Sequence, residues 1–179
     1  DEARLVYAGD AFREAGNDGP EWRTIHLGLD LFLPPGTPVL APLGGVVHSF
    51  RDNAARLDYG PTVVLRHTVD GGRLTFFTLY GHLDRDAIAW LRPGQPIATG
   101  SEVGRVGDTA VNGGWPPHLH FQIVTDLLER QGDFPGVGRA SQRAVWTSLS
   151  PDPNLIARIP MPVSAPAGPT PDHLLAVRR

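Results

Sequence analysis

Three short segments of this sequence carry side chains that could do metal or acid–base chemistry. They are His26-Leu27-Gly28-Leu29-Asp30, Tyr80-Gly81-His82-Leu83 and His118-Leu119-His120-Phe121. Imidazole and carboxylate are the nitrogen and oxygen ligands that zinc accepts in proteins. Histidine is also the usual general acid or base near neutral pH. The chemistry therefore depends on whether the fold brings the three segments together.

The histidine pair His118 and His120 belongs to an alternating run that is typical of a strand. His118, His120 and Gln122 share one face, and the apolar residues that alternate with them mark the core side. Two imidazoles whose Cα atoms lie about 7 Å apart on one face can serve one site, with one binding a metal and the other contacting what the metal binds. A solvent-facing pair is the alternative, although Pro116-Pro117 fixes the entry of the strand.

His26 and Asp30 also share a face if their segment is extended. Four residues of extended chain span roughly 13 Å, which is too far for both side chains to reach one metal ion comfortably. The chain must therefore bend, and Gly28 can absorb the bend. A helix would bring positions i and i+4 together, but Gly28 and the stop at Pro34-Pro35-Gly36 argue against one. A hydrogen-bonded His–Asp pair without a metal is the alternative.

The remaining histidines give weaker signals. His82 ends an apolar strand, where a single histidine is most often a capped or satisfied surface residue. His48 and His67 lie within strand patterns without polar companions, and His173 lies in the C-terminal tail. We assign no role to those three.

The elements that must position these residues are predicted to be strands. From Ile25 to Val124, short apolar runs alternate with turn residues at intervals of about 8 to 12 residues. The predicted fold is mainly β, with antiparallel sheets forming a partly open barrel or sandwich, glycine-rich turns and few short helices. The candidate strands are Leu27–Leu33, Val39–Ala41, Val46–Phe50, Thr62–Val69, Leu74–Tyr80, Gln95–Thr99 and His118–Val124, with a hairpin turn at Asp70-Gly71-Gly72 and one short helix at Asp84–Leu91.

The composition excludes several classes of function. The sequence has no cysteine, and all 16 basic residues are arginine, which excludes thiolate nucleophiles, thiolate metal sites, disulfides and Schiff-base lysines. The lack of lysine also excludes a lipoyl or biotinyl carrier module, which Val39–Pro42 and Gly45–Val47 otherwise resemble. The net charge is −3, and no apolar run approaches the roughly 20 residues that span a bilayer. We therefore expect no nucleic-acid partner and no membrane insertion.

In this order, the HxxxD, YGHL and HLHF motifs resemble those of the M23 peptidases, zinc endopeptidases that include lysostaphin-like peptidoglycan hydrolases. The resemblance covers about Thr24 to Val124 and extends to the turns at Gly36–Pro42, Gly44–Val47, Tyr59–Val64, Pro93–Gln95 and Val103-Gly104. It implies that His26, Asp30 and His120 ligate one Zn²⁺ per chain. It also implies that His82 and His118 are the catalytic pair.

The implied chemistry is metal-assisted hydrolysis of a peptide bond. Three protein ligands leave a fourth position on zinc for water, whose pKa falls towards neutrality. The sequence has no HExxH glutamate, so His118 is the candidate base and His82 the candidate donor to the oxyanion. The implied substrate is a peptide, such as peptidoglycan or a glycine-rich cross-link. The alternative is a zinc-retaining binding or regulatory module that does not hydrolyse peptidoglycan.

The sequence divides into an N-terminal arm (1–23), an M23-like domain (24–159, with its motif core at 24–124) and a proline-rich linker or tail (160–179). The segment Gly107–Pro117, which contains Trp115, departs from the family's small-residue turn and alters the wall of the groove. The flanks Ser150–Leu155 and Leu174–Arg179 resemble those of an M23-like domain that lies between a kinase-like and a class III aminotransferase domain in large fused proteins. That resemblance predicts further covalently fused domains and a cytoplasmic parent, with the cell envelope as the alternative location.

Overall fold

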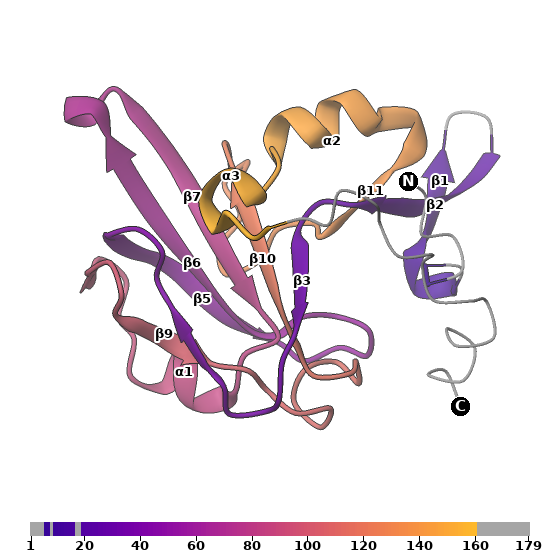
Figure 1. Ribbon diagram of the computed structural model, residues 1–179. Helices are drawn as coiled ribbons and strands as arrows, with labels where there is room; N and C mark the ends of the chain where they lie inside the picture. Colours follow the sequence, from indigo (N-terminus) through magenta and orange to yellow (C-terminus); the bar gives the residue numbers. More distant parts are fainter. Residues whose placement is uncertain (1–5, 8, 17–18, 161–179) are drawn as a thin grey trace.

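The computed structural model describes residues 6–7, 9–16 and 19–160, and its centre is a six-stranded antiparallel sheet (Figure 1). The spatial order of its strands is β3, β10, β7, β6, β5, β8. Strands β5 to β7 follow one another as hairpins, whereas β10 lies between β3 and β7. The strand with the histidine pair therefore has the strand of Asp30 on one side and the strand leading to His82 on the other. The bounds are β3 Leu29–Phe32, β5 Gly45–Asn53, β6 Gly60–Val69, β7 Leu74–Gly81, β8 Pro96–Ile97 and β10 His118–Val124.

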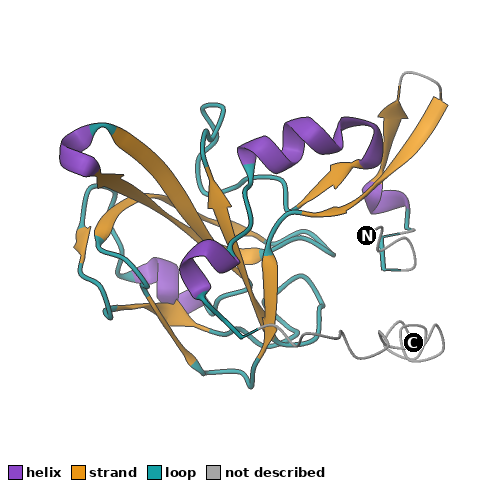
Figure 2. Cartoon of the chain, turned by 45° about the horizontal axis from the view of Figure 1, so that its top comes forward, coloured by secondary structure: helices purple, strands orange, loops and turns teal. Residues whose placement is uncertain are grey.

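Two smaller sheets and a few short helices complete the described part. A three-stranded sheet in the order β1, β2, β11 projects to one side of the large sheet, and β2 leads directly into β3 (Figure 1). Strands β4 and β9 form a two-stranded sheet. The helices are short and lie at the periphery (Figure 2). The bounds are β1 Arg13–Gly16, β2 Gly19–His26, β4 Pro38–Leu40, β9 Glu102–Arg105, β11 Val137–Arg139, α1 Arg85–Ala89, α2 Arg143–Leu149 and α3 Asn154–Ala157, with 3₁₀ turns η1 Asp10–Phe12, η2 Asp70–Gly72 and η3 Ala140–Gln142.

The large sheet is covered on both faces. Side chains of its central strands are therefore buried whichever face they point to. On β6, Val63 and Leu65 face one cluster while Val64 between them faces another, and all three are fully buried. The first cluster includes side chains of β4, β9 and α1. The second includes Phe134, with Trp146 of α2 packed against it.

The predicted fold class, mainly β with antiparallel sheets and few short helices, is confirmed. Most predicted strands are present with shifted ends, and His118–Val124 matches β10 residue for residue. The predicted strand Gln95–Thr99 is reduced to Pro96–Ile97. The helix expected at Asp84–Leu91 is α1, whose first turn is capped by the Asp84 carboxylate accepting from the Ala87 amide at 3.0 Å.

The predicted strand Leu27–Leu33 is shortened to β3, Leu29–Phe32, because the chain bends at Gly28 after β2 ends at His26. The expected bend at Gly28 is therefore present. No strand or helix was predicted after Val124, where the structure has β11, α2 and α3, which are too short for a periodic signal. Most of the proline-rich tail lies outside the described residues.

None of the helices in the described ranges combines the length and the apolar character that crossing a bilayer requires.

Core packing predicts unequal effects for the same substitution on neighbouring strands. Leu65 on β6 is fully buried, whereas Leu74 on β7 is 55% exposed. We expect Leu65→Ala to lower the free energy of unfolding by about 2–5 kcal/mol, because it removes buried methyl groups and leaves a cavity. Leu74→Ala should change it by less than about 0.5 kcal/mol. Urea unfolding of both variants measures this, and equal losses would contradict the assignment of the core.

His67 was expected to lack polar companions, and the structure corrects this. Its ring is buried, with Nδ1 2.9 Å from the Gly44 carbonyl oxygen and Nε2 2.7 Å from the Thr78 hydroxyl. Because a carbonyl only accepts, Nδ1 carries the proton and Nε2 accepts from Thr78. Burial lowers the pKa of His67 below its ordinary value of 6.5.

This burial predicts a pH dependence of stability. The unfolded chain takes up a proton at His67 near pH 6.5, but the folded chain does so only at lower pH, so stability is lost as the pH falls below about 6.5. His67→Gln keeps one donor and one acceptor and should flatten this dependence. It should not abolish it, since burial also lowers the pKa of His48, His82 and His118. Denaturant unfolding of the wild type and of His67→Gln at about pH 7 and about pH 5 gives the free energy of unfolding that each protein loses between the two pH values. Equal losses would contradict the prediction.

Candidate metal centre

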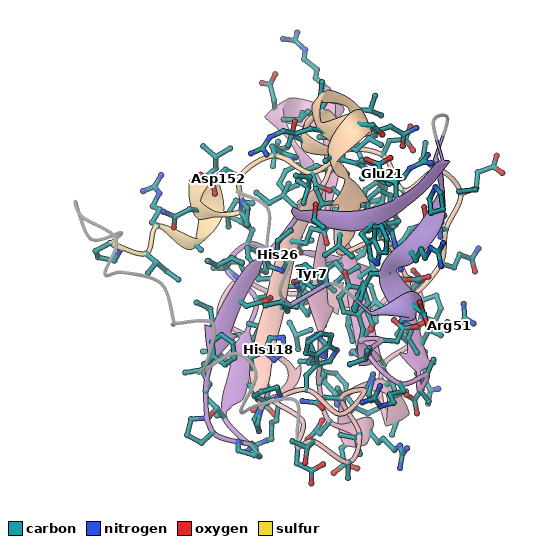
Figure 3. The ribbon with its side chains drawn as sticks, turned by 90° about the vertical axis from the view of Figure 1, so that its right-hand side faces the viewer. Tyr7, Glu21, His26, Arg51, His118 and Asp152 are labelled. Atoms are coloured by element: carbon teal, nitrogen blue, oxygen red, sulfur yellow. The ribbon has the colours of Figure 1, made fainter. Side chains whose placement is uncertain are left out.

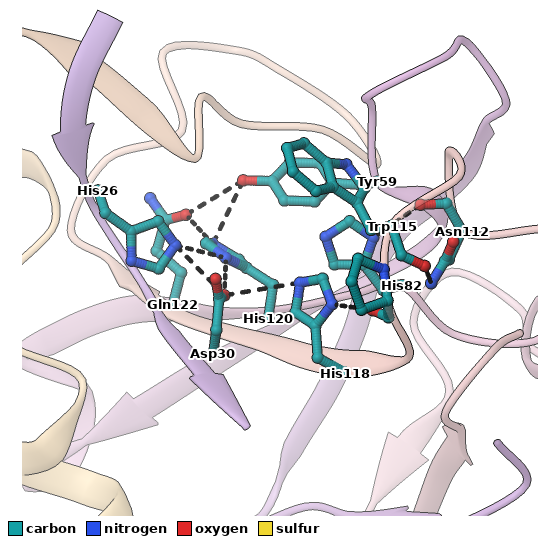
Figure 4. A network of polar contacts seen from close by, with 10 residues as sticks. His26, Asp30, Tyr59, His82, Asn112, Trp115, His118, His120 and Gln122 are labelled. Carbon is teal, nitrogen blue, oxygen red and sulfur yellow. Dashed lines mark hydrogen bonds and ion pairs between the residues drawn. The ribbon is translucent and has the colours of Figure 1, made fainter. Parts of the chain in front are cut away.

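Strand pairing brings the three sequence segments to one place. In the register of the large sheet, His120 on β10 lies opposite Asp30 on β3 and, on its other side, opposite Gly81 at the end of β7. His26 ends β2, directly before the bend into β3. His82 follows Gly81. Every predicted site residue is thus within one cluster, which Figure 3 places beside the junction of the small and large sheets and Figure 4 shows from close by.

Gly28 is required at the bend for a steric reason. A Cβ atom built on Gly28 would clash with Cε1 and Nε2 of His120. The ring of His120 therefore packs directly on the backbone of residue 28, which only glycine allows. This contact lets His26 and Asp30 approach the same side of His120, although extended chain would hold them far apart.

Three potential ligand atoms converge at this point. Asp30 Oδ1 lies 2.9 Å from His120 Nδ1 and 3.2 Å from His26 Nε2, and the two ring nitrogens are 3.2 Å apart. Tetrahedral zinc with bonds of about 2.0–2.1 Å separates its ligands by about 3.3 Å. The three distances are close to that value. The donor set, two imidazoles and a carboxylate, thus fits a mononuclear zinc site in both chemistry and spacing.

The site is partly enclosed. The side chain of His120 is 3% exposed, whereas those of His26 and Asp30 are each 25% exposed, so the cluster opens to solvent on their side. Burial alone would raise the pKa of Asp30, but its close contacts with the imidazole rings of His120 and His26 outweigh burial and hold that pKa well below its ordinary range. Asp30 is therefore a carboxylate, as a metal ligand must be.

The second pair of histidines lies beside the converging atoms. His118 Nε2 is 3.9 Å from Asp30 Oδ1, and the ring centroids of His118 and His82 are 4.1 Å apart. His118 Nδ1 donates to the Pro116 carbonyl at 2.6 Å, and His82 Nδ1 donates to the Asn112 carbonyl at 3.1 Å. Since carbonyls only accept, both neutral rings carry their proton on Nδ1 and keep a lone pair on Nε2. Burial lowers the pKa of both rings, which favours these neutral forms.

The backbone of His82 holds this ring in an unusual conformation. Its φ is +61°, a left-handed value that a histidine seldom adopts. Its amide donates to the Tyr59 carbonyl at 2.9 Å, and its carbonyl accepts from the Gly107 amide at 2.8 Å. These two hydrogen bonds fix the turn after β7. Such strain, held in place by neighbours, is typical of functional positions.

Aromatic rings border the cluster on two sides. Tyr7 stacks on His26 at 6.3 Å between centroids, and Phe12 and Trp115 belong to the same small apolar cluster. On the other side Phe32 stacks on His118 at 5.2 Å and is 68% exposed. The N-terminal segment, which we expected to be an arm rather than core, therefore contributes buried residues next to the site. Trp115 lies in the loop expected to shape the groove, and its carbonyl accepts from the Asn112 side chain at 2.9 Å.

Sequence reasoning missed two polar neighbours of His120, namely Tyr59 and Gln122. Gln122 was placed on the face of the two histidines, so its signal was available, but that face was not expected to be buried. In the structure every residue of β10 is buried on both faces. Buried polar groups need partners, and those of Gln122 and Tyr59 lie in the same network as His120 (Figure 4).

Comparisons with known proteins find a matching family and several relatives. Residues 24–131 match the sequence profile of peptidase family M23. An uncharacterized metalloprotease of Haemophilus influenzae is 34% identical over 98 residues, which is 55% of this chain and 18% of that protein. The peptidoglycan DD-endopeptidase ShyC of Vibrio cholerae is 32% identical over 105 residues, 59% of this chain and 21% of that protein.

A third relative, the DD-carboxypeptidase/endopeptidase Mpg of Neisseria meningitidis, is 36% identical over 101 residues, 56% of this chain and 20% of that protein. The chain thus matches only about a fifth of the length of these relatives. Among solved structures, the catalytic domain of the prophage-encoded M23 protein EnpA of Enterococcus faecalis has a TM-score of 0.48 at 24% identity, covering 69% of this chain and 88% of that chain. The catalytic domain of lysostaphin from Staphylococcus simulans has a TM-score of 0.45 at 21% identity, covering 69% and 80%.

The converging atoms predict which histidines bind metal. We expect His120→Ala to lose zinc on purification, because it removes one of three ligands, and to weaken zinc affinity by more than the roughly 10–100-fold that loss of an outer partner costs. His48→Ala is the matched control, since the hydrogen bond of that ring goes to Ser49 on β5. Metal analysis of the dialysed proteins measures the difference. Full zinc occupancy in His120→Ala would remove this residue from the ligand set.

Proposed function

The chain belongs to peptidase family M23, and from that premise we propose that it is a zinc-dependent endopeptidase. The observation that carries the proposal is the convergence of His26, Asp30 and His120, with the free Nε2 lone pair of His118 on the same side. In this proposal His26 Nε2, Asp30 Oδ1 and His120 Nδ1 hold one zinc ion. Bound zinc supplies Lewis acidity, which lowers the pKa of water towards neutrality and polarises a carbonyl oxygen.

His118 is proposed as the general base. Its proton is held on Nδ1 by the Pro116 carbonyl, so a proton from the attacking water has one place to go, the lone pair on Nε2. Phe32 packs against the ring and Pro116 fixes its rotation. The same nitrogen can then return the proton to the amine that leaves when the peptide bond breaks.

His82 needs a proton before it can act as a donor. In its neutral form Nδ1 donates to Asn112, and Nε2 can only accept. A donor role towards the oxyanion, as the motif implies, therefore follows the arrival of a proton in the His82–His118 pair, whose rings are 4.1 Å apart. We accordingly propose that the one proton that His118 takes from water passes to His82 Nε2 while the oxyanion is present, and that it returns through His118 to the leaving amine.

Peptidoglycan peptides are the proposed substrate class. Support comes from the relatives named as peptidoglycan DD-endopeptidase and DD-carboxypeptidase/endopeptidase. The exposed ring of Phe32 and the partly buried Trp115 give the site two apolar borders, against which a peptide can lie. Because the chain covers about a fifth of those relatives, the substrate of the whole protein is a proposal.

The proposed roles predict that one substitution can lower the rate of peptide cleavage without releasing zinc. We expect His118→Ala to keep zinc and to lower kcat on cell-wall peptides by about 10²- to 10⁴-fold, because it removes the proton acceptor without touching a ligand. Zinc analysis measures the metal content and steady-state kinetics measures kcat, with His48→Ala as the control. A chelator should abolish cleavage by the wild type.

Two outcomes would contradict this proposal in different ways. An unchanged kcat in His118→Ala would remove His118 from the mechanism. Zinc binding by the wild type without cleavage of any cell-wall or glycine-rich peptide would instead favour a zinc-retaining binding module.

A further inference from the structure

We propose that Gln122 is a positioning residue, which fixes the proton of the His120 ring on Nε2 and thereby turns the Nδ1 lone pair towards Asp30 and His26. The inference rests on the proposed function, because it assumes that a metal ion binds at those atoms. It concerns an interaction on the opposite side of the His120 ring, inside the protein (Figure 4).

The orientation of the Gln122 amide follows from its partners. One end of the amide lies 3.1 Å from the Pro135 carbonyl oxygen, and a carbonyl can only accept a hydrogen bond. That end must therefore be the NH₂ group, which also donates to the Ser150 hydroxyl at 2.8 Å. The amide oxygen is then forced to the other end. Gln122 is fully buried, so no solvent competes for either end.

The amide oxygen in turn dictates the tautomer of His120. It lies 2.9 Å from His120 Nε2 and 3.4 Å from the Tyr59 hydroxyl. An amide oxygen only accepts, so Nε2 must carry a proton and Tyr59 must donate. In neutral His120 the lone pair is then on Nδ1, the atom 2.9 Å from Asp30.

This arrangement favours a bound cation over an empty site. A lone pair on Nδ1 and a carboxylate oxygen at 2.9 Å repel each other unless a cation lies between them. The other neutral tautomer would let Nδ1 donate to Asp30, but its bare Nε2 would then face the Gln122 oxygen. Gln122 thus disfavours the metal-free hydrogen bond that would compete with zinc.

The residues that accept hydrogen bonds from Gln122 lie beyond the segment that matches the family. Pro135 and Ser150 lie beyond residue 131, the last matched position. Ser150 is buried directly after α2, and its amide donates to the Trp146 carbonyl at 2.8 Å. The residue that follows α2 therefore helps to hold Gln122, the side chain that contacts His120. We infer that zinc affinity depends on this segment as well as on the motif strands.

The test compares two buried amides on the same sheet. Gln122→Met keeps the length of the side chain and removes its hydrogen bonds. Asn53→Leu is the matched control, because the buried Asn53 amide donates to Thr62 and Gly132. Zinc affinity is measured by competition with a chromophoric chelator, and the ligand geometry by the visible absorption of the Co²⁺-loaded protein. We expect Gln122→Met to weaken zinc about 10- to 100-fold and to alter the Co²⁺ spectrum. Asn53→Leu should lower stability with zinc affinity unchanged.

Each outcome bears on one claim. If Gln122→Met binds zinc as tightly as the wild type, or if Asn53→Leu loses as much zinc affinity as Gln122→Met, the proposed role of Gln122 is wrong. Neither result would contradict the zinc site itself. Failure of the wild type to bind zinc would instead overturn the proposed function.

A second measurement needs no variant. Nitrogen-15 NMR of the histidine rings in the zinc-loaded wild type should show His120 bound through Nδ1 with a proton on Nε2. Binding through Nε2 would overturn the inference.

Discussion

The pairing of β10 between β3 and β7 is the constraint on which the site depends. In the observed register His120 lies opposite Asp30 and Gly81, so backbone pairing brings together two candidate ligands that are far apart in sequence. A slip of one residue would turn His118, His120 and Gln122 to the other face and bring Leu119 and Phe121 to the site. The register is held by burial, because the apolar face of β10 packs into the main core. The same strand therefore sets both the core packing and the positions of candidate ligands.

The polar face of β10 is buried as well, which would be costly without partners. Carbonyl groups provide many of them. Pro116 fixes the ring of His118, Asn112 fixes that of His82, and Pro135 orients Gln122. A carbonyl accepts and never donates, so each of these contacts also decides where a proton resides. The loops thus contribute to the chemistry of the site by defining tautomers.

The sequence alone predicted those features of the fold and the site that depend on a local pattern of residues. Alternation located β10, and the need for a bend between His26 and Asp30 pointed to Gly28, where the structure shows the His120 ring against the backbone. Long-range packing was not accessible in this way. Tyr7 lies on His26 although no periodic signal connects them, and the buried Gln122 amide finds its partners at Pro135 and at Ser150, directly after α2. Fusion to other domains, cellular location and the proposed domain boundaries stay predictions.

In the proposed site His26, Asp30 and His120 together hold one zinc ion. A crystal structure of the purified chain, with anomalous diffraction recorded at the zinc absorption edge, would locate that ion. We expect one strong peak within bonding distance, about 2.0–2.2 Å, of His26 Nε2, Asp30 Oδ1 and His120 Nδ1. A peak bound by His82 or His118 in place of these atoms, or no peak from zinc-loaded protein, would contradict the proposed site.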